Sequence, residues 1–331
     1  MSSQNQSLFM AYKDYFPIGA AVNTKTIKTH GDILIKHFNS ITAENEMKFE
    51  SLHPKAGEYN FTDSDLIYDF AQRNNMKLRG HTLVWHNQTP AWVFEDNEGK
   101  EISKEALLKT LDEHIYVLAN RYGDGIYCWD VANEVIEDKE EEYLRDSKWL
   151  RIIGEDYIMR AFEMTHKKLP NTLLFYNDYN ESTPKKREKI VRLVSSLKES
   201  GTPIHGVGLQ GHWNIFEPSF DEIKRSFEIY ASLGLKVQIT EMDISMFGFE
   251  DKRMDLTKPT AGMIEKQAMI YEKAFRMFRE YKEVINGVTL WGIADDENWL
   301  DNFPVRGRKN WPLLFDENHE PKEAFYRILQ F

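Results

Sequence analysis

The chain has 331 residues, 42 of them basic and 53 acidic, which gives a formal charge of −11. Proteins that bind nucleic acid or an anionic membrane surface need a basic footprint, so this charge argues against both kinds of partner. The single cysteine, Cys128, excludes an internal disulfide. It lies in an apolar run, where a buried and unreactive thiol is expected.

Residues 1–14 are polar, without the basic start and apolar stretch of a secretion signal. No segment approaches the roughly 20 apolar residues that span a bilayer. We therefore expect no membrane association and a protein that stays in the cytoplasm. No Pro/Ser-rich linker or low-complexity tract divides the sequence, which indicates one domain over residues 1–331.

Short apolar runs alternate with longer amphipathic stretches along the whole chain. Eight successive strand-then-helix units predict an α/β fold, a closed (β/α)8 TIM barrel. A doubly wound open sheet is the alternative; it usually has a Gly-rich phosphate loop after its first strand, and residues 19–22 (GAAV) form no such loop. The predicted strands are 16–22, 40–44, 78–85, 126–134, 173–178, 206–212, 237–243 and 287–293, and the predicted helices are 26–37, 63–74, 104–121, 149–169, 184–200, 220–233, 261–281 and 322–329.

Polar and aromatic residues end nearly every predicted strand. Active sites of such barrels lie at the C-terminal ends of the strands, where side chains from different strands converge. The pattern therefore predicts a polar cleft at that end of the barrel. The strand-end residues are Glu44 and Asn45, His81 and Trp85, Asn133 and Glu134, Asp178 and Tyr179, Gln210 and His212, Glu241 and Asp243, and Trp291.

Two of these residues, Glu134 and Glu241, are suited to cleaving a glycosidic bond. That reaction needs a proton donor for the leaving oxygen and a carboxylate facing the anomeric carbon. Retaining enzymes hold the two carboxyl groups about 5–5.5 Å apart, and at that distance one of the two pKa values rises. The spacing along the chain does not say which glutamate is the acid.

Six segments, in order, carry a resemblance to family-10 glycoside hydrolases. They are 42–48 (TAENEMK), 79–86 (RGHTLVWH), 129–134 (WDVANE), 208–212 (GLQGH), 239–243 (ITEMD) and 290–292 (LWG). The resemblance extends over roughly residues 16–316. It implies a retaining endo-1,4-β-xylanase on a (β/α)8 barrel that needs no cofactor and acts on xylan or xylo-oligosaccharides. No segment resembles the carbohydrate-binding module that some members carry.

The resemblance also implies roles for individual residues. Glu134 resembles the acid/base, Glu241 the nucleophile, and Asn133 the amide that binds the sugar 2-hydroxyl. His212 resembles the imidazole that hydrogen-bonds the nucleophile, and Tyr179 the platform for the first leaving-side sugar. The others resemble residues that grip the second sugar on the non-reducing side (Glu44, Asn45 and Lys48), surround the reacting sugar (His81, Trp85 and Gln210) or form aromatic walls (Trp291 and Trp299).

Some residues have a structural interpretation beside the functional one. Trp129 and Trp149 are expected in the core, whereas Trp299 lies in a polar loop where an indole has no evident packing partner and a sugar face would explain it. Arg306 is a weaker candidate for contact with substrate hydroxyls or an acidic decoration. The acidic run 137–142 (EDKEEE) is expected to be a solvated loop, with contact to leaving-side sugars as the alternative.

A metal site is not expected, because a catalytic zinc needs three well-placed ligands. His81 and His86 would lie on opposite faces of a strand. Two rival functions stay open at this point. One is a retaining β-1,4-glucanase on the same barrel, and the other is a non-catalytic polysaccharide-binding barrel. The lack of a secretion signal predicts that imported xylo-oligosaccharides are the natural substrate.

Overall fold

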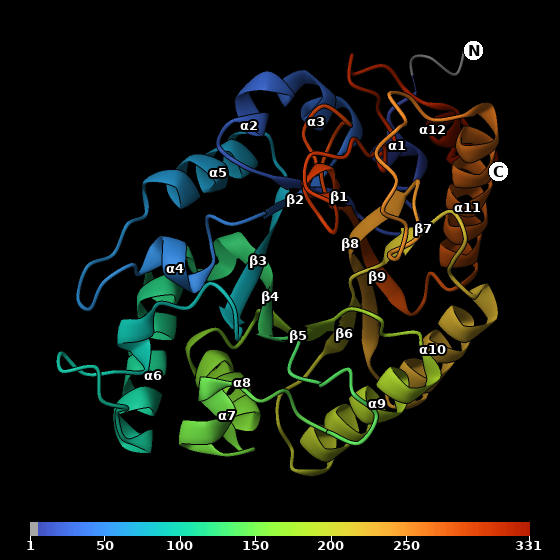
Figure 1. Ribbon diagram of the computed structural model, residues 1–331. Coiled ribbons are helices and arrows are strands. Elements are labelled where there is room, and N and C mark those ends of the chain that lie inside the picture. Colours follow the sequence, from blue (N-terminus) through green and yellow to red (C-terminus); the bar gives the residue numbers. More distant parts are fainter. Residues whose placement is uncertain (1–5) are drawn as a thin grey trace.

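A computed structural model describes residues 6–331, and eight parallel strands close into a barrel within that range (Figure 1). β6 pairs with β8 and β1 pairs with β9, so the barrel has no open edge and the doubly wound sheet is excluded. The predicted (β/α)8 barrel is confirmed. The barrel strands are β1 (Ile18–Val22), β2 (Ser40–Ala43), β3 (Lys77–Val84), β4 (Ile126–Asn133), β5 (Leu173–Asp178), β6 (Gly206–Leu209), β8 (Lys236–Ser245) and β9 (Ile285–Leu290).

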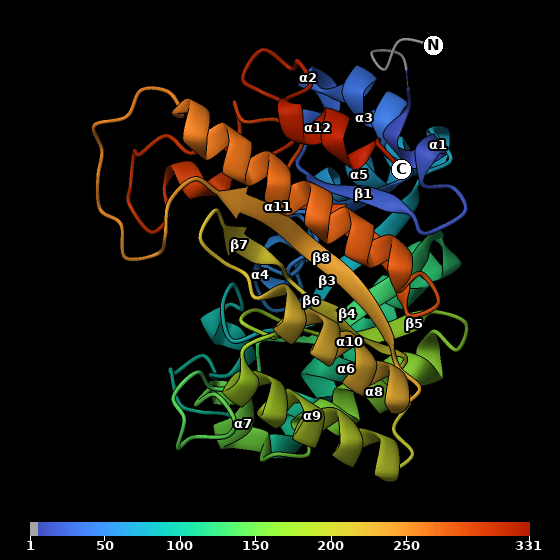
Figure 2. The same cartoon turned by 90° about the vertical axis from the view of Figure 1, so that its right-hand side faces the viewer.

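The helices surround the barrel and cover the outward faces of the strands (Figures 1 and 2). Serine and threonine side chains cap several of them; the hydroxyl of Ser103 accepts a hydrogen bond from the backbone N–H of Ala106, and that of Thr260 from Met263. No helix of residues 6–331 is long and apolar enough to cross a membrane. The helices are α1 (Leu8–Ala11), α2 (Thr26–Thr29), α3 (Gly31–His37), α4 (Phe49–Leu52), α5 (Thr62–Arg73), α6 (Lys104–Tyr122), α7 (Lys148–Ile153), α8 (Tyr157–Lys168), α9 (Pro184–Glu199), α10 (Phe220–Ser232), α11 (Ala261–Glu280) and α12 (Glu323–Ile328).

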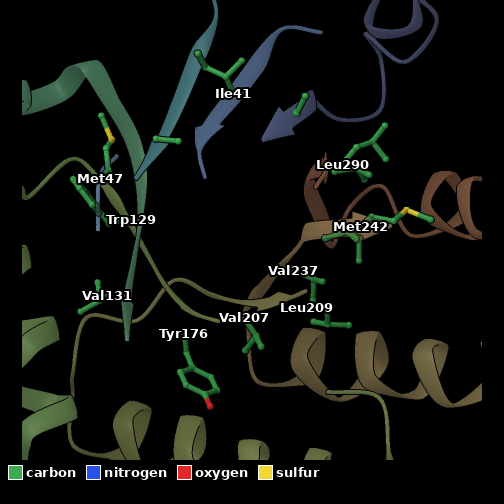
Figure 3. Close-up of a cluster of buried hydrophobic side chains, with 14 of the residues drawn as sticks. Ile41, Met47, Trp129, Val131, Tyr176, Val207, Leu209, Val237, Met242 and Leu290 are labelled. Atoms are coloured by element: carbon green, nitrogen blue, oxygen red, sulfur yellow. The ribbon is translucent and has the colours of Figure 1, made fainter. Parts of the chain in front are cut away.

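The largest apolar core lies between the strands and the helices. Figure 3 shows Tyr176 pointing from its strand toward the helices, with Trp129 among the other buried side chains. Trp129 and Trp149 are each 1% exposed, which confirms that both are packing residues. Cys128 is free and fully buried, and burial raises the pKa of its thiol to about 11, so the thiolate is disfavoured.

Three predicted elements are wrong because a local backbone break interrupts them. The predicted strand 206–212 ends at Leu209; Gly211, at φ 75°, turns the chain, and a short strand β7 (His212–Asn214) follows beside β8. The predicted helix 149–169 is two helices, separated by Gly154 at φ 95°. The predicted helix 26–37 divides at His30 into α2 and α3.

Candidate active site

A cleft of about 940 Å³ opens at the C-terminal ends of the strands. Thirteen of the fourteen predicted site residues line it, from Glu44 after β2 to Trp299 after β9. Arg306 is the exception: its side chain is exposed and is not among the lining residues. Barrel closure therefore gathers residues from 44 to 299 around one space, as the strand-end pattern predicts.

Glu134 follows directly on β4 and has a left-handed backbone, with φ 55°. A non-glycine residue needs support in this conformation. Its N–H donates to the carbonyl oxygen of Asn177 at 2.8 Å, and its own carbonyl oxygen accepts from Nε of Arg145 at 3.0 Å. Each carboxylate oxygen also has a donor: Nε1 of Trp85 at 2.8 Å and Nε2 of Gln210 at 3.0 Å. The carboxyl group is thus held in one orientation at the cleft surface.

Glu241, on β8, is 5% exposed and has a different electrostatic environment. One carboxylate oxygen lies 3.2 Å from Nε2 of His212, and the other accepts from Nδ2 of Asn177 at 2.8 Å. Burial alone would raise the pKa of this carboxyl. The hydrogen bond from His212, the electrostatic effects of His81 and His212 and the hydrogen bond from the Asn177 amide outweigh burial and lower the pKa to about 2. Glu241 is therefore ionised at neutral pH.

His212 bridges two carboxylates. Its Nδ1 lies 2.9 Å from Oδ2 of Asp243, and its Nε2 faces Glu241. Burial lowers the pKa of the imidazole, but the charges and hydrogen bonds of Asp243 and Glu241 raise it to about 10. His212 is therefore an imidazolium at neutral pH, with both N–H groups donating to anions.

Trp299 has protein partners after all, contrary to the expectation from its polar loop. Its Nε1 donates to Oδ2 of Asp243 at 2.8 Å, and its indole stacks on Phe303 with ring centroids 5.1 Å apart. It also contacts His212 edge-on, with centroids 4.9 Å apart. The indole lines the cleft as predicted, and Asp243 fixes its orientation.

A chain of side-chain amides joins the two glutamates. Nδ2 of Asn177 donates at 2.8 Å both to Asn133 and to Glu241, while Oδ1 of Asn177 accepts from Thr240 at 2.7 Å. Gln210 continues the chain to Glu134. Nδ2 of Asn133 is buried without a partner among residues 6–331 and is free to donate to a substrate hydroxyl. The sequence prediction omitted Asn177; its position in the polar end of the strand 173–178 was the only signal.

Below the cleft, a fully buried ion pair supports His81. Nδ1 of His81 lies 2.8 Å from Oδ2 of Asp130, which also accepts from Arg79 at 2.5 Å. The register between β4 and β5 shifts between Asp130 and Ala132, and this irregularity lets both Asp130 and Asn133 reach the interior network. Strict alternation would put 130 and 133 on opposite faces, so the sequence pattern did not identify Asp130 or Arg79 as supporting residues.

Lys48 lies at the end of the cleft formed after β2. Its Nζ donates to Oδ1 of Asn45 at 3.0 Å and to Oε1 of Gln88 at 2.9 Å. Burial lowers the pKa of Lys48, although the negative charges of Glu241, Glu44 and Glu134 act to raise it. Burial likewise raises the pKa of Glu44. The predicted group of Glu44, Asn45 and Lys48 is thus assembled, with Gln88 as a member that the sequence did not reveal.

Tyr179 is positioned at the opposite wall by charged neighbours. Its hydroxyl accepts from Nη2 of Arg145 at 2.7 Å and donates to Asp138, which also accepts from Lys186 at 2.8 Å. Asp138 is exposed, in agreement with the solvated-loop interpretation, and it also lines the cleft. Residues 139–142 are likewise exposed. Contact of this acidic run with leaving-side sugars stays a prediction.

Among residues 6–331, one cluster of three side chains could hold a metal ion, and it lies outside the cleft lining. It consists of His30, Asp296 and His319. No sequence pattern predicted this cluster, because the three residues come from separate segments. His81 binds Asp130 instead of converging with His86 on a metal ligand set.

The chain matches known proteins over nearly its whole length. The profile of Glycosyl hydrolase family 10 matches residues 7–331. Endo-1,4-beta-xylanase B of Paenibacillus barcinonensis is 55% identical, with 99% of each chain covered, and Endo-1,4-beta-xylanase A of Caldicellulosiruptor saccharolyticus is 57% identical, with 99% of this chain and 96% of that one covered. A crystal structure of the Paenibacillus enzyme has a TM-score of 0.97 over 99% of both chains at 55% identity. The chain therefore belongs to glycosyl hydrolase family 10.

Proposed function

We propose that the cleft hydrolyses internal β-1,4 linkages of xylan and xylo-oligosaccharides by double displacement, with Glu241 as nucleophile and Glu134 as acid/base. The chain is an endo-1,4-β-xylanase, since relatives with this activity share 52–57% identity over its whole length. The observation that carries the assignment of roles is the contrast between the two glutamates. Glu241 is buried with its pKa held at about 2, whereas Glu134 lies at the cleft surface, where no cationic side chain of residues 6–331 contacts its carboxylate.

In the first step, an oxygen of Glu241 attacks the anomeric carbon while Glu134 gives its proton to the departing glycosidic oxygen. The bond from C1 to the leaving oxygen breaks, and an ester bond from C1 to Glu241 forms. In the second step, Glu134 takes a proton from water, the water oxygen attacks C1 and Glu241 leaves as carboxylate. Two inversions at C1 return the original configuration.

The remaining lining residues position the sugars on either side of these glutamates. The unpartnered amide N–H of Asn133 supports its role at the 2-hydroxyl of the reacting sugar. Lys48 and its amide partners offer donors and acceptors to the next sugar on the non-reducing side. The rings of Tyr179 and Trp299 offer flat faces to the apolar C–H side of a pyranose.

The preference for xylose over glucose rests on the C6 hydroxymethyl group, which xylose lacks. Trp291 is only 7% exposed, and a hydrogen bond to Asp243 fixes the indole of Trp299. We expect these two side chains to move too little to admit the hydroxymethyl group. We expect xylan to be hydrolysed far faster than carboxymethyl cellulose. Comparable rates on the two polymers would favour the β-1,4-glucanase alternative instead.

Matched variants test the two roles separately. Glu241→Gln should abolish activity on every substrate, because the ester bond between residue 241 and C1 of the sugar cannot form. Glu134→Ala should reduce xylan hydrolysis by about 10²- to 10⁴-fold. With an aryl xylobioside that has a good leaving group, Glu134→Ala should still carry out the first step at a nearly normal rate. This step is measured as a burst of released aglycone. Glu140→Gln, in the exposed loop, is the control. Near-normal hydrolysis by Glu241→Gln, or an α-configured first product by NMR, would refute the mechanism.

A further inference from the structure

We propose that His30, Asp296 and His319 form a zinc site outside the catalytic cleft. Their ligand atoms lie within 4.8 Å of one another. Nε2 of His30 is 2.9 Å from Oδ1 of Asp296, and Nε2 of His319 is 3.4 Å from Oδ2 of the same carboxylate. Zinc bonds of about 2.0–2.2 Å in a tetrahedron separate ligand atoms by about 3.4 Å, so small adjustments would admit the ion.

Both ring nitrogens of His30 have a polar neighbour. Its Nδ1 lies 2.7 Å from the hydroxyl of Thr29, and its Nε2 faces the carboxylate of Asp296. Zinc-binding histidines commonly have the ring nitrogen that does not face the metal held by a hydrogen bond in this way.

The second imidazole brings a further nitrogen to the same carboxylate. The rings of His30 and His319 lie with centroids 4.2 Å apart. One dication can therefore bind a nitrogen of each ring together with the carboxylate. Two imidazoles with one carboxylate are a ligand set suited to zinc.

The backbone at His319 is a third, independent observation. His319 has φ 68°, in a turn that Asp316 organises by accepting hydrogen bonds from the N–H groups of Asn318 and Glu320 at 2.8 and 2.9 Å. Glycine or asparagine would adopt this conformation at lower cost. A strained residue that points a ligand atom into a cluster is typical of a functional position.

The burial of the three ligands leaves room for a water molecule on the metal. The side chain of His30 is 1% exposed, whereas those of Asp296 and His319 are each 34% exposed. Three protein ligands with one open side leave a fourth position for water.

The ion would connect segments that are far apart in the sequence. His30 lies between α2 and α3, Asp296 in the loop after β9 and His319 just before α12; in both views α2, α3 and α12 lie on the same side of the barrel (Figures 1 and 2). A cavity of about 150 Å³ is lined by His30, Trp291 and Trp299, and the two tryptophans also line the cleft. Zinc would therefore hold the loop that carries both tryptophan walls against the N- and C-terminal segments.

Zinc binding is measured on the untagged full chain after removal of metals with EDTA. Equilibrium dialysis at micromolar free zinc, read by elemental analysis, should give one zinc per chain. His319→Asn should lose it while keeping the turn, because asparagine tolerates positive φ. Asp296→Asn is the second variant, should the first fold poorly. His166→Asn, a histidine outside the cluster, should bind zinc like the wild type.

Thermal unfolding gives a readout independent of activity. Saturating zinc should raise the Tm of the wild type and of His166→Asn by about 3 °C or more, and leave His319→Asn and Asp296→Asn unchanged. In the Glu241→Gln protein, which should not hydrolyse it, saturating xylohexaose should not displace the ion, because the ligands lie outside the cleft lining. Less than half a zinc per wild-type chain, full zinc on both cluster variants, or displacement by xylohexaose would overturn the proposal.

Discussion

At the scale of single residues, the ionisation of Glu241 depends on His212 and its anchor. The chain of contacts runs from Nε1 of Trp299 to Asp243, from Asp243 to His212 and from His212 to Glu241. The orientation of the Trp299 indole and the charge state of Glu241, the proposed nucleophile, therefore both depend on Asp243. A change at any member should alter both sugar binding and pH dependence.

Removing the imidazolium of His212 should raise the pKa of Glu241, the proposed nucleophile. In the wild type, Glu241 with a pKa of about 2 is ionised throughout the ordinary range. In His212→Asn the pKa of Glu241 rises, so the acid limb of the kcat/KM profile moves to higher pH. The shift should be about one to two pH units, because one charge-assisted hydrogen bond is lost. The pH profile on an aryl xylobioside measures this, with His166→Asn as control. An acid limb unchanged in His212→Asn would mean that other groups hold the carboxylate ionised.

At the scale of elements, one glycine in β6, Gly208, makes room for the amide chain. A Cβ on Gly208 would lie 2.3 Å from Oδ1 of Asn177 and 2.8 Å from Cγ2 of Thr240. These two residues hold the amide that donates to Glu241. Because Gly208 on β6 has no side chain, Asn177 on the neighbouring strand β5 can place its amide beside Glu241.

Gly208→Ala should therefore damage activity as well as stability. The inserted methyl group must displace Asn177 and is expected to lower the free energy of unfolding by about 1–3 kcal/mol. It should also lower kcat at temperatures where the protein is fully folded. Gly262→Ala, in α11 with no atom within 4 Å of the added Cβ, should be neutral or slightly stabilising. Urea unfolding and kcat at 25 °C test both; a Gly208→Ala protein with normal kcat would show that Asn177 can be moved freely.

At the scale of the whole molecule, ionisation of the site contributes to folding stability. His212 has a pKa of about 10 in the folded protein and an ordinary value near 6.5 in the unfolded chain. Its stabilising contribution is complete below pH 6.5 and is lost as pH rises toward 10. Glu241 acts in the opposite sense: its contribution is present above pH 4.5 and lost as pH falls toward 2.

The difference between wild type and His212→Asn isolates this contribution from the other groups that titrate. The stability advantage of the wild type should shrink steadily between pH 7 and pH 10, as its imidazolium loses the proton. Urea midpoints measured at pH 6, 7, 8, 9 and 10 for both proteins test the slope. A difference that stays constant over this range would contradict the raised pKa of His212.

The sequence by itself determined the fold class and the ends of most strands, because these depend on local periodicity, and polar residues at strand ends predicted most of the cleft lining. The same pattern marked Glu134 and Glu241 as the proposed reacting pair, and the family resemblance added Lys48 and Trp299. The sequence prediction missed the break at Gly211, where one residue with positive φ ends a strand that hydrophobicity alone would continue.

Only the tertiary structure decided which residues support that pair. Asn177 next to Glu241, Asp243 beneath Trp299, and the register shift that turns both Asp130 and Asn133 inward all depend on closure of the barrel. The cluster of His30, Asp296 and His319 depends on the same closure. The physical reason is range: local patterns report which way a side chain faces along its own element, whereas a hydrogen bond between residues far apart in the chain exists only once the strands are in register.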